Sequence, residues 1–280
     1  ALYFVSPDTF NSIVSLLTGD SSESNNSNTS GGSGTILDGV SEGDLVMYML
    51  DVGQGDGIYI QFPDGKDMLI DCGSVGGTNL ATYTSSETYS PYAMLEELVS
   101  DDTIDYVMVT HGDKDHVSFM DEVFSLYQVN NVYMPNILAE NDAVTNANLD
   151  ADKLALFTDK DTLTSDVYAY FFIAALTEEN CEIHLNIGNF TLSGVGWKID
   201  FFCMTQEEWD ATDLSDAHEK NMISPVGILQ CNNKKIVLTG DSNKENETTD
   251  GATSKEMTSS IAKIKEFHGV DSLDCDILKV

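Results

Sequence analysis

The stretch that most constrains this chain is an apolar run that ends in a cluster of metal-binding residue types. The run YVMVT, residues 106–110, predicts a buried strand because it is short, apolar and rich in β-branched residues. His111, Asp113, Asp115 and His116 follow at once, which places four potential ligands within six residues. A loop after a strand can turn all four inward, and imidazole nitrogen with carboxylate oxygen suits Zn²⁺ or Mn²⁺. The alternative is a polar surface turn, but this spacing directly after a strand favours a metal site.

The charge of the chain limits its partners. The 280 residues carry a formal net charge of −34, and all thirteen basic residues are Lys, with no Arg. Such a surface repels polyanions and lacks the bidentate phosphate contacts of Arg. This counts against stable, non-specific nucleic-acid binding, although a metal site can still engage one phosphate locally. The acidity suits solubility, or a salty or extracellular setting.

The five cysteines give no sign of a metal cluster or a disulfide framework. Cys72, Cys203 and Cys231 lie in apolar, strand-like contexts, which predicts buried thiols. No apolar run reaches the length of a membrane span.

The N-terminal part differs in composition from the rest. Residues 21–36 are nearly pure Ser, Asn, Gly and Thr, which predicts a flexible linker where a protease should cut first. We therefore divide the chain into an N-terminal segment with linker, residues 1–43, and a globular domain, residues 44–280. A signal or membrane anchor upstream of such a linker is the usual plan of an exported protein. We expect an extracellular or cell-surface location.

The domain reads as a mixture of strands and helices. Strands are predicted at 45–52, 58–62, 68–73, 106–110, 131–135, 181–185, 190–193, 199–204, 226–231, 235–238 and 276–280. Helices are predicted from Pro91 onward and at 117–127, 163–176 and 254–267, with irregular segments at 139–162 and 206–220. An antiparallel meander followed by a β-α-β segment predicts an α+β fold.

Four motifs together carry a family resemblance. LDVGQGD at 50–56, LIDCG at 69–73, THGDKDH at 110–116 and LTGD at 238–241 occur in the order and rough spacing of the metallo-β-lactamase superfamily. The first and third look most like the ComEC-type branch, the hydrolase-like domain of bacterial DNA-uptake proteins and its secreted relatives. The resemblance covers residues 46–280.

The resemblance implies a four-layer αββα sandwich with two divalent ions, Zn or Mn, at one edge between the sheets. The implied metal ligands are His111 and Asp113 for one ion, Asp115 and His116 for the other, and Asp241 as the bridge. Asp71 is implied to brace the ligand loop from beneath. The two ions would activate a water for attack on a carbonyl or phosphoryl group. Asp115 and Asn221 are the implied catalytic residues, and Asn221 with Ser224 resembles polar residues of the ComEC-type branch near the substrate.

The sequence departs from the family pattern at two places. Ser118 and Phe119 stand where the family has two small glycines, which crowds the helix start. The family's His-His-Gly-Ser type motif follows a strand like residues 275–280, where the given sequence ends. Its His ligand is therefore not included, and we expect the given sequence to bind one metal weakly, or none, and to be a poor catalyst. Among the other histidines, His184 and His268 are interpreted as structural, and His218 is the best remaining ligand candidate.

The function predicted from these features is a metal-dependent hydrolase, most plausibly a phosphodiesterase or nuclease-like enzyme. The alternative is an exported, non-catalytic binding or accessory module with the same fold, which the charge of −34 favours over a DNA nuclease. A third possibility is an esterase acting on a small phosphorylated or choline-type group. The expected partner is a phosphoester or other small hydrolysable substrate. DNA should not bind tightly, and membrane contact would come only through an upstream anchor.

Overall fold

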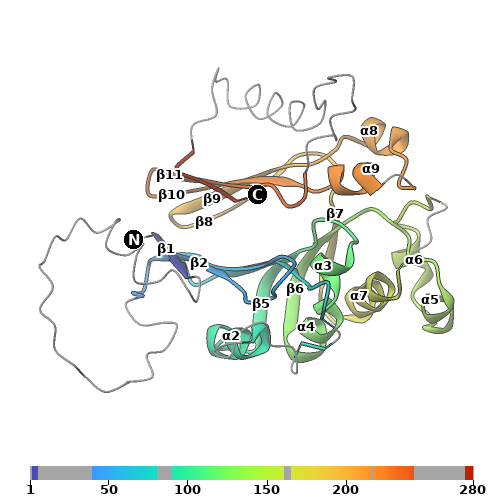
Figure 1. The fold of residues 1–280 in the computed structure, drawn as a ribbon, viewed down its shortest axis with the longest axis horizontal. Coiled ribbons are helices and arrows are strands. Elements are labelled where there is room, and N and C mark those ends of the chain that lie inside the picture. The colour runs from blue at the N-terminus through green and yellow to red at the C-terminus, as the bar shows by residue number, and fades with distance from the viewer. Residues whose placement is uncertain are drawn as a thin grey trace, which may run out of the picture.

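The computed structural model describes residues 2–5, 40–77, 79–80, 90–160, 165–215, 217–242 and 275–279. Within these ranges the chain forms two stacked sheets with helices against the first (Figure 1). None of the helices in these ranges combines the length and the apolar character that a membrane span requires. The predicted linker, residues 21–36, the predicted helix at 254–267 and His268 lie outside the described residues.

The first sheet has seven strands that follow one another in chain order. They are β1 (Leu2–Val5), β2 (Leu45–Met49), β3 (Gly57–Gln61), β4 (Asp67–Cys72), β5 (Thr103–Met108), β6 (Gln128–Met134) and β7 (Glu182–Leu185). Strands β2, β3 and β4 pair antiparallel, as the predicted meander requires, and β1 is parallel to β2. Strands β4 to β7 are parallel, so the loops after them leave the sheet at one edge.

The second sheet has five strands in the order β12-β11-β10-β9-β8. They are β8 (Phe190–Gly194), β9 (Trp197–Phe202), β10 (Val226–Cys231), β11 (Lys234–Leu238) and β12 (Ile277–Lys279). The first four pair antiparallel, and β12 runs parallel to β11. The register places Leu238 beside Lys279, so the two strands end together.

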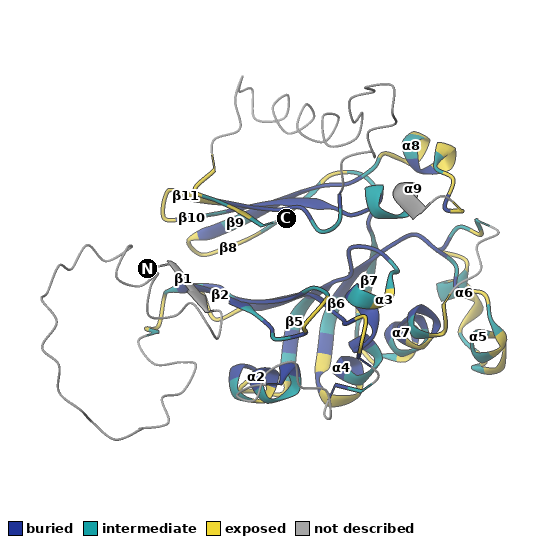
Figure 2. Ribbon diagram, viewed as in Figure 1, coloured by how far each residue is buried: buried dark blue, intermediate teal, exposed yellow. Residues whose placement is uncertain are grey.

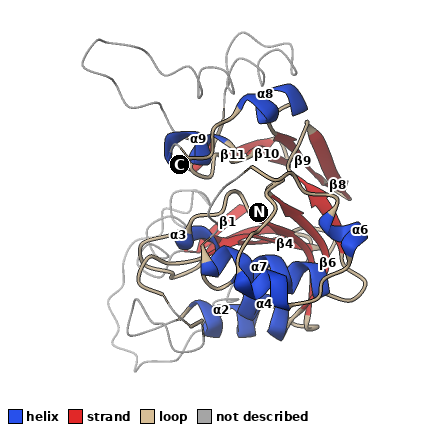
Figure 3. Cartoon of the chain, turned by 90° about the vertical axis from the view of Figure 1, so that its right-hand side faces the viewer, coloured by secondary structure: helices blue, strands red, loops and turns tan. Residues whose placement is uncertain are grey.

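Helices cover the outer face of the first sheet (Figures 1 and 3). They are α2 (Pro91–Leu98), α4 (Met120–Leu126) and α7 (Asp166–Thr177), with short helices α3 (Lys114–Val117), α5 (Asp142–Asn146) and α6 (Ala151–Leu154) nearby. Helices α8 (Gln206–Ala211) and α9 (Ala217–Met222) lie on the connection from β9 to β10. Helix α2 begins as predicted, with Pro91 in its first turn and the Ser90 side chain accepting the Ala93 N–H at 3.1 Å.

Two apolar cores hold these layers together (Figure 2). One lies between the first sheet and its helices and includes Leu69, Val107, Val123 and Phe171. The other lies between the two sheets and includes Met68, Met108, Ile199 and Leu229. Alternate residues of β4 and β5 therefore face opposite cores, which explains the unbroken apolar stretches at 68–70 and 106–109. The described layers give the mixed α+β sandwich that the sequence predicted.

Three predicted segments have a different secondary structure in the fold: one helix is broken in two, and two segments expected to be irregular contain helices. The predicted helix at 117–127 is broken into α3 and α4. The Phe119 N–H bonds the Cys72 carbonyl at 3.0 Å, and the Ser118 hydroxyl contacts the Ser74 backbone. These tertiary contacts turn the chain between the two helices.

The predicted irregular segment 206–220 contains α8 and most of α9. Helix α8 starts with a capping box between Thr205 and Glu208, a local signal that the sequence carries. The predicted irregular segment 139–162 contains α5 and α6.

Candidate metal centre

The candidate metal centre lies where β5 and β11 end, one strand from each sheet. The ligand loop, residues 109–116, leaves β5, and Asp241 follows β11. The ligand atoms of His111, His116 and Asp241 all lie within 4.8 Å of one another. The two Asp241 carboxylate oxygens lie 4.0 Å from His111 Nε2 and 3.5 Å from His116 Nε2. The structure thus brings Asp241 to the histidines across 125 residues of sequence, as the strand-end pattern predicts.

Gly240 allows Asp241 to take this position. Its φ of +51° lies in the left-handed region, where a side chain is strained. A Cβ at this position would also lie 3.1 Å from side-chain carbons of both Thr110 and Ser224. The Gly-Asp turn is therefore required by the close approach of the two strand ends.

Asp71 holds the imidazole of His116 from behind. The carboxylate is fully buried and lies 2.8 Å from His116 Nδ1. It also accepts hydrogen bonds from the Thr110 backbone N–H at 2.8 Å and the Thr110 hydroxyl at 2.7 Å. Burial raises the pKa of Asp71, but the three donors that surround it favour an accepting carboxylate. His116 Nδ1 therefore carries a proton that it donates to Asp71, and Nε2, on the side of Asp241, is the nitrogen left for a metal ion.

The same carboxylate orients His111 through Thr110. Thr110 Oγ1 donates to Asp71 and lies 3.1 Å from His111 Nδ1, so it accepts the Nδ1 proton. The Ser224 hydroxyl lies 3.4 Å from the same nitrogen. His111 Nε2 is buried and has no hydrogen-bond partner among the described residues. Asp71 thus sets the tautomer of both histidines, which exceeds the bracing role expected from the sequence.

Electrostatics distinguish the two histidines. Burial lowers the pKa of His111, and the neighbouring charge of His116 lowers it further, so the imidazole stays neutral. Burial also acts to lower the pKa of His116, but the contacts with Asp241 and Asp71 outweigh burial and raise it. The contact with His116 in turn lowers the pKa of Asp241. Asp241 is therefore an ionised carboxylate at neutral pH, as a metal ligand requires.

The two other predicted ligands differ in position. Asp113 Oδ2 lies 3.8 Å from His111 Nε2, close enough to share an ion. Neither Asp113 nor Asp115 belongs to the two groups of described residues whose ligand atoms converge, and Asp115 has no contact with the histidines comparable to that of Asp113 among the described ion pairs. The Asp115 backbone carbonyl accepts the Asp56 N–H at 2.9 Å, which ties the ligand loop to the turn before β3. The ligand roles of these residues remain predictions.

Helix α9 brings Asn221 toward the same edge of the sandwich. Asn221 Oδ1 is buried and has no hydrogen-bond partner within the described ranges. Ser224, two residues beyond the helix, contacts His111, so it supports a candidate ligand rather than facing outward. His218 lies in α9, and its side chain is not among those described. His184 lies on β7, and its ring stacks on that of Tyr133 with the ring centroids 4.4 Å apart. This packing agrees with the predicted structural role.

Sequence reasoning did not assign roles to Asp56 and Lys279. Asp56, Asp71 and His116 form the second group of convergent ligand atoms, and Lys279 is ion-paired with Asp56. The acidic end of the LDVGQGD motif was the available signal for Asp56. No local signal pointed to Lys279, because its partner lies 223 residues away.

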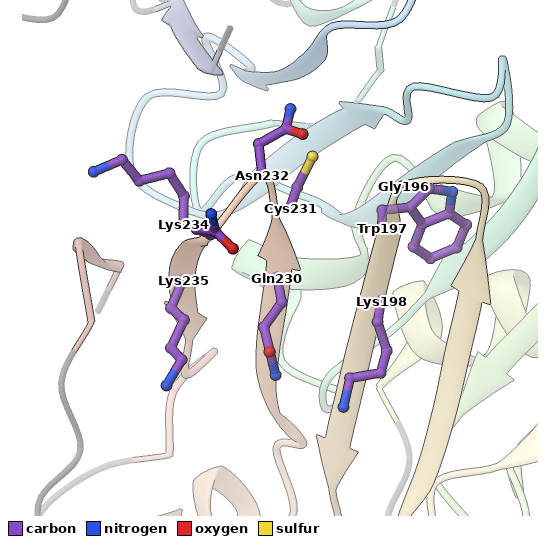
Figure 4. Close-up of a pocket in the computed structure, with 9 residues that line it drawn as sticks. Gly196, Trp197, Lys198, Gln230, Cys231, Asn232, Lys234 and Lys235 are labelled. Carbon is purple, nitrogen blue, oxygen red and sulfur yellow. The ribbon is translucent and has the colours of Figure 1, made fainter.

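A shallow cavity of about 430 Å³ lies at the other end of the second sheet (Figure 4). Its wall includes Lys198, Lys234 and Lys235 and the turn between β10 and β11. Lys234 begins β11, whereas Asp241 follows the end of that strand, so the cavity is remote from the histidines. Lys198 and Lys234 already pair with carboxylates at 2.7 and 2.6 Å. The candidate site is therefore the histidine cluster.

The residues present fit a divalent metal ion. A buried imidazole nitrogen without a hydrogen-bond partner is costly, unless the atom serves a ligand. His111 Nε2 faces two carboxylates, and His116 Nε2 faces one of them. Each histidine is held through its other nitrogen, the arrangement typical of metal-binding histidines.

The fold and this cluster together define a class, an α+β sandwich with a histidine and aspartate metal site at the strand ends. Residues 50–142 match the family model described as the metallo-beta-lactamase superfamily, which is less than half of the chain. Over these residues the chain is thus similar to the metallo-beta-lactamase superfamily, whose members are generally metal-dependent hydrolases. A search of curated proteins finds no match to the sequence.

Several solved structures are similar to this chain at low sequence identity. The metallo-beta-lactamase fold protein YhfI from Bacillus subtilis is 14% identical, with 71% of this chain and 63% of that chain covered and a TM-score of 0.35. CmlA, a diiron beta-hydroxylase from Streptomyces venezuelae, is 13% identical. The match covers 83% of this chain and 34% of CmlA, with a TM-score of 0.38. A possible metal-dependent hydrolase from Veillonella parvula is 12% identical, with 81% and 69% covered and a TM-score of 0.39. The chain thus spans less than two thirds of the first two relatives.

Proposed function

We propose that this protein is a metal-dependent hydrolase that cleaves phosphodiesters, using a water activated at the His111, His116 and Asp241 cluster. The observation that carries the proposal is the buried, unpartnered Nε2 of His111, which faces Asp241 at 4.0 Å and Asp113 at 3.8 Å. The LDVGQGD and THGDKDH motifs support a place in the ComEC-type branch.

The residues of the chain have separate tasks in this proposal. His111, His116 and Asp241 would hold a divalent ion, Zn²⁺ or Mn²⁺, with Asp113 beside them. A bound divalent ion lowers the pKa of its water and stabilises the negative charge that develops on a phosphoryl oxygen. Asp71 holds the Nδ1 proton of His116 directly and that of His111 through Thr110, which leaves both Nε2 atoms as the nitrogens for the ion.

Asn221 and Asp115 have the proposed catalytic roles. Asn221 is half-buried, and its amide oxygen has no hydrogen-bond partner among the described residues, so the amide is suited to contact substrate or the attacking water. The resemblance implies a second ion at Asp115 and His116. Because Asp115 joins neither convergent group, the geometry favours a first ion at the histidine cluster and makes the second depend on Asp115 turning inward.

The substrate we propose is a small phosphodiester, because the charge of −34 and the absence of Arg oppose tight DNA binding. The linker-like composition of residues 21–36 supports an extracellular or cell-surface location for the protein. Any membrane contact would be made by an upstream anchor.

The test measures metal content by mass spectrometry and turnover of a chromogenic phosphodiester with Mn²⁺ or Zn²⁺. The wild type is expected to bind at least one ion, and His111→Ala and Asp241→Asn to lose both metal and turnover. His184→Ala is the matched control, because this histidine is stacked on Tyr133 outside the cluster and should leave both unchanged. A wild type without bound metal would refute the proposal. Stoichiometric metal without turnover on any ester would favour the non-catalytic binding module.

A further inference from the structure

Lys279 and Asp56 form an ion pair that joins the two sheets beside the candidate metal centre. Lys279 is the last residue of β12 in the second sheet, and Asp56 lies in the turn before β3 in the first. Their side chains are each only 16% exposed. An ion pair this sheltered is screened little by solvent, so its loss leaves a poorly solvated charge.

The Asp56 end of the pair is fixed to the ligand loop. The Asp56 N–H donates to the Asp115 carbonyl at 2.9 Å, and its own carbonyl accepts the Gly73 N–H at 3.0 Å. An Asp56 carboxylate oxygen also lies within 4.8 Å of ligand atoms of Asp71 and His116. A movement of Asp56 is therefore transmitted directly to the backbone that carries Asp115 and His116.

The Lys279 end is fixed to the turn that carries Asp241. The Lys279 carbonyl accepts the Thr239 N–H at 3.3 Å and the Thr239 hydroxyl at 3.1 Å. Its neighbour across the parallel pair is Leu238, the last residue of β11. Asp241 comes three residues later, so β12 supports the turn from which Asp241 reaches the histidines.

We propose that Lys279 is a positioning residue of the candidate metal centre, and that its ion pair with Asp56 fastens the Asp241 turn to the ligand loop. The inference deepens the proposed function and rests on it where metal affinity is concerned. Without the ion pair, hydrogen bonds within each sheet would still hold each half of the site, but the distance between the halves would be less fixed.

The metal affinity of the Lys279→Met variant separates this role from a simple charge effect, because for that variant the two predict changes of opposite sign. Removing an ammonium group near a cation site removes Coulomb repulsion, so charge alone predicts tighter metal binding. Removing a tether between ligand-bearing segments predicts weaker binding, by about tenfold for a supporting residue of a metal site.

The experiment titrates Zn²⁺ or Mn²⁺ into the full chain and five variants by calorimetry. Lys279→Met and Asp56→Asn are each expected to weaken binding about tenfold. The double variant should be no weaker than either single variant, since all three break one tether. Lys279→Arg, which keeps the pair, should bind nearly as the wild type does. Unchanged or tighter binding by Lys279→Met would overturn the proposal.

Lys234→Met is the matched control, because Lys234 begins β11 and pairs with Asp276 at 2.6 Å at the far end of the same two strands. It should leave metal affinity unchanged; a tenfold loss here as well would show that any ion pair on these strands has the same effect, and would overturn the specific role of Lys279.

Hydrogen exchange on the metal-free protein tests the tether even if no metal binds. Lys279→Met should speed exchange in both 113–119 and 239–242, whereas Lys234→Met should not. Faster exchange in 239–242 alone would overturn the proposal, because it would show that the ligand loop does not depend on the pair. Absence of metal from the wild type, by contrast, would refute the proposed function and leave this measurement decisive.

Discussion

Asp71→Asn is the substitution that most directly tests how the candidate centre is built. Asp71 has a positive φ of 54°, and Asn tolerates this region about as well as Asp, so the backbone strain is unchanged. The side chains have nearly the same shape. What changes is that one acceptor oxygen becomes an NH₂ donor.

The cost can be worked out from the hydrogen bonds that Asp71 accepts. The Asn oxygen can still accept the Thr110 backbone N–H, which lies 2.8 Å from Oδ1 in the wild type. The new NH₂ group then takes the place of Oδ2, where it meets the Thr110 hydroxyl and His116 Nδ1, both of which donate. Two hydrogen bonds to a charged acceptor are lost, at about 1.5 kcal/mol or more each, so we expect about 3 kcal/mol of destabilisation.

The same change alters the histidines. His116 can relieve the clash by moving its proton to Nε2, and the Thr110 hydroxyl can relieve it by turning toward His111 Nδ1. Both shifts favour a protonated Nε2, the atom proposed to bind metal. Metal affinity should therefore fall by about tenfold to a hundredfold, the range for supporting groups of metal-binding histidines.

Two measurements check this prediction, denaturant unfolding of the metal-free protein and calorimetric titration with Zn²⁺ or Mn²⁺. Asp64→Asn is the control, because Asp64 accepts bonds from Val195 N and Trp197 Nε1 at 2.9 Å, far from the histidines. It should cost stability without changing metal affinity. If Asp71→Asn binds metal as tightly as the wild type, the reasoning that Asp71 sets both tautomers is refuted.

Three further predictions concern stability and charge. Burial raises the pKa of Asp67 to about 6, above an unfolded value near 4, so its contribution to stability is complete below about pH 4 and is lost as the pH rises through 6. In denaturant unfolding, the free energy of unfolding of Asp67→Asn should rise relative to that of the wild type by up to about 3 kcal/mol between pH 4 and 7. A difference between the two proteins that does not change with pH would contradict this. A Cβ at Gly77 would lie 2.2 Å from Phe119 Cζ, so Gly77→Ala should cost about 1–3 kcal/mol, and a Phe119→Leu change should restore part of it. Added salt should raise kcat/KM for an anionic diester by screening the charge of −34, with no such rise for a neutral ester.

The sequence predicted best those features that depend on short stretches of chain. Strand β5 and the ligand loop could be placed because an apolar run meets four ligands within six residues. The meander β2-β3-β4 followed from tight turns such as Pro63-Asp64-Gly65 between alternating segments. The approach of Asp241 to the histidines could be predicted because the strands that carry them both end in polar turns.

Features that depend on long-range contacts could not be predicted. The break between α3 and α4 arises because Ser118 and Phe119 bond to Ser74 and Cys72, which lie far back along the chain, and neither helical residue alone signals this. The pair of Lys279 and Asp56 requires two sheets to meet before the residues become neighbours. The position of Asp115 depends on a side-chain direction within one short helix, which the spacing of the ligands cannot determine.

The set of donor atoms bears on which metal the centre would prefer. The convergent group offers two imidazole nitrogens and a carboxylate, and the nearest further donor, Asp113, is again a carboxylate. Cys72 follows Asp71 in sequence, but its side chain packs in the core between the first sheet and its helices, and burial raises its thiol pKa. Among the described residues no cysteine joins the convergent groups, so the described donors give no preference for soft ions. Asp113 offers a carboxylate oxygen where a further histidine would offer nitrogen. This raises the affinity of the site for harder ions such as Mn²⁺ relative to its affinity for Zn²⁺. The buried Nε2 of His111 still supplies a nitrogen ligand, which suits Zn²⁺. The relative affinity of the site for Zn²⁺ and Mn²⁺ therefore depends on Asp113.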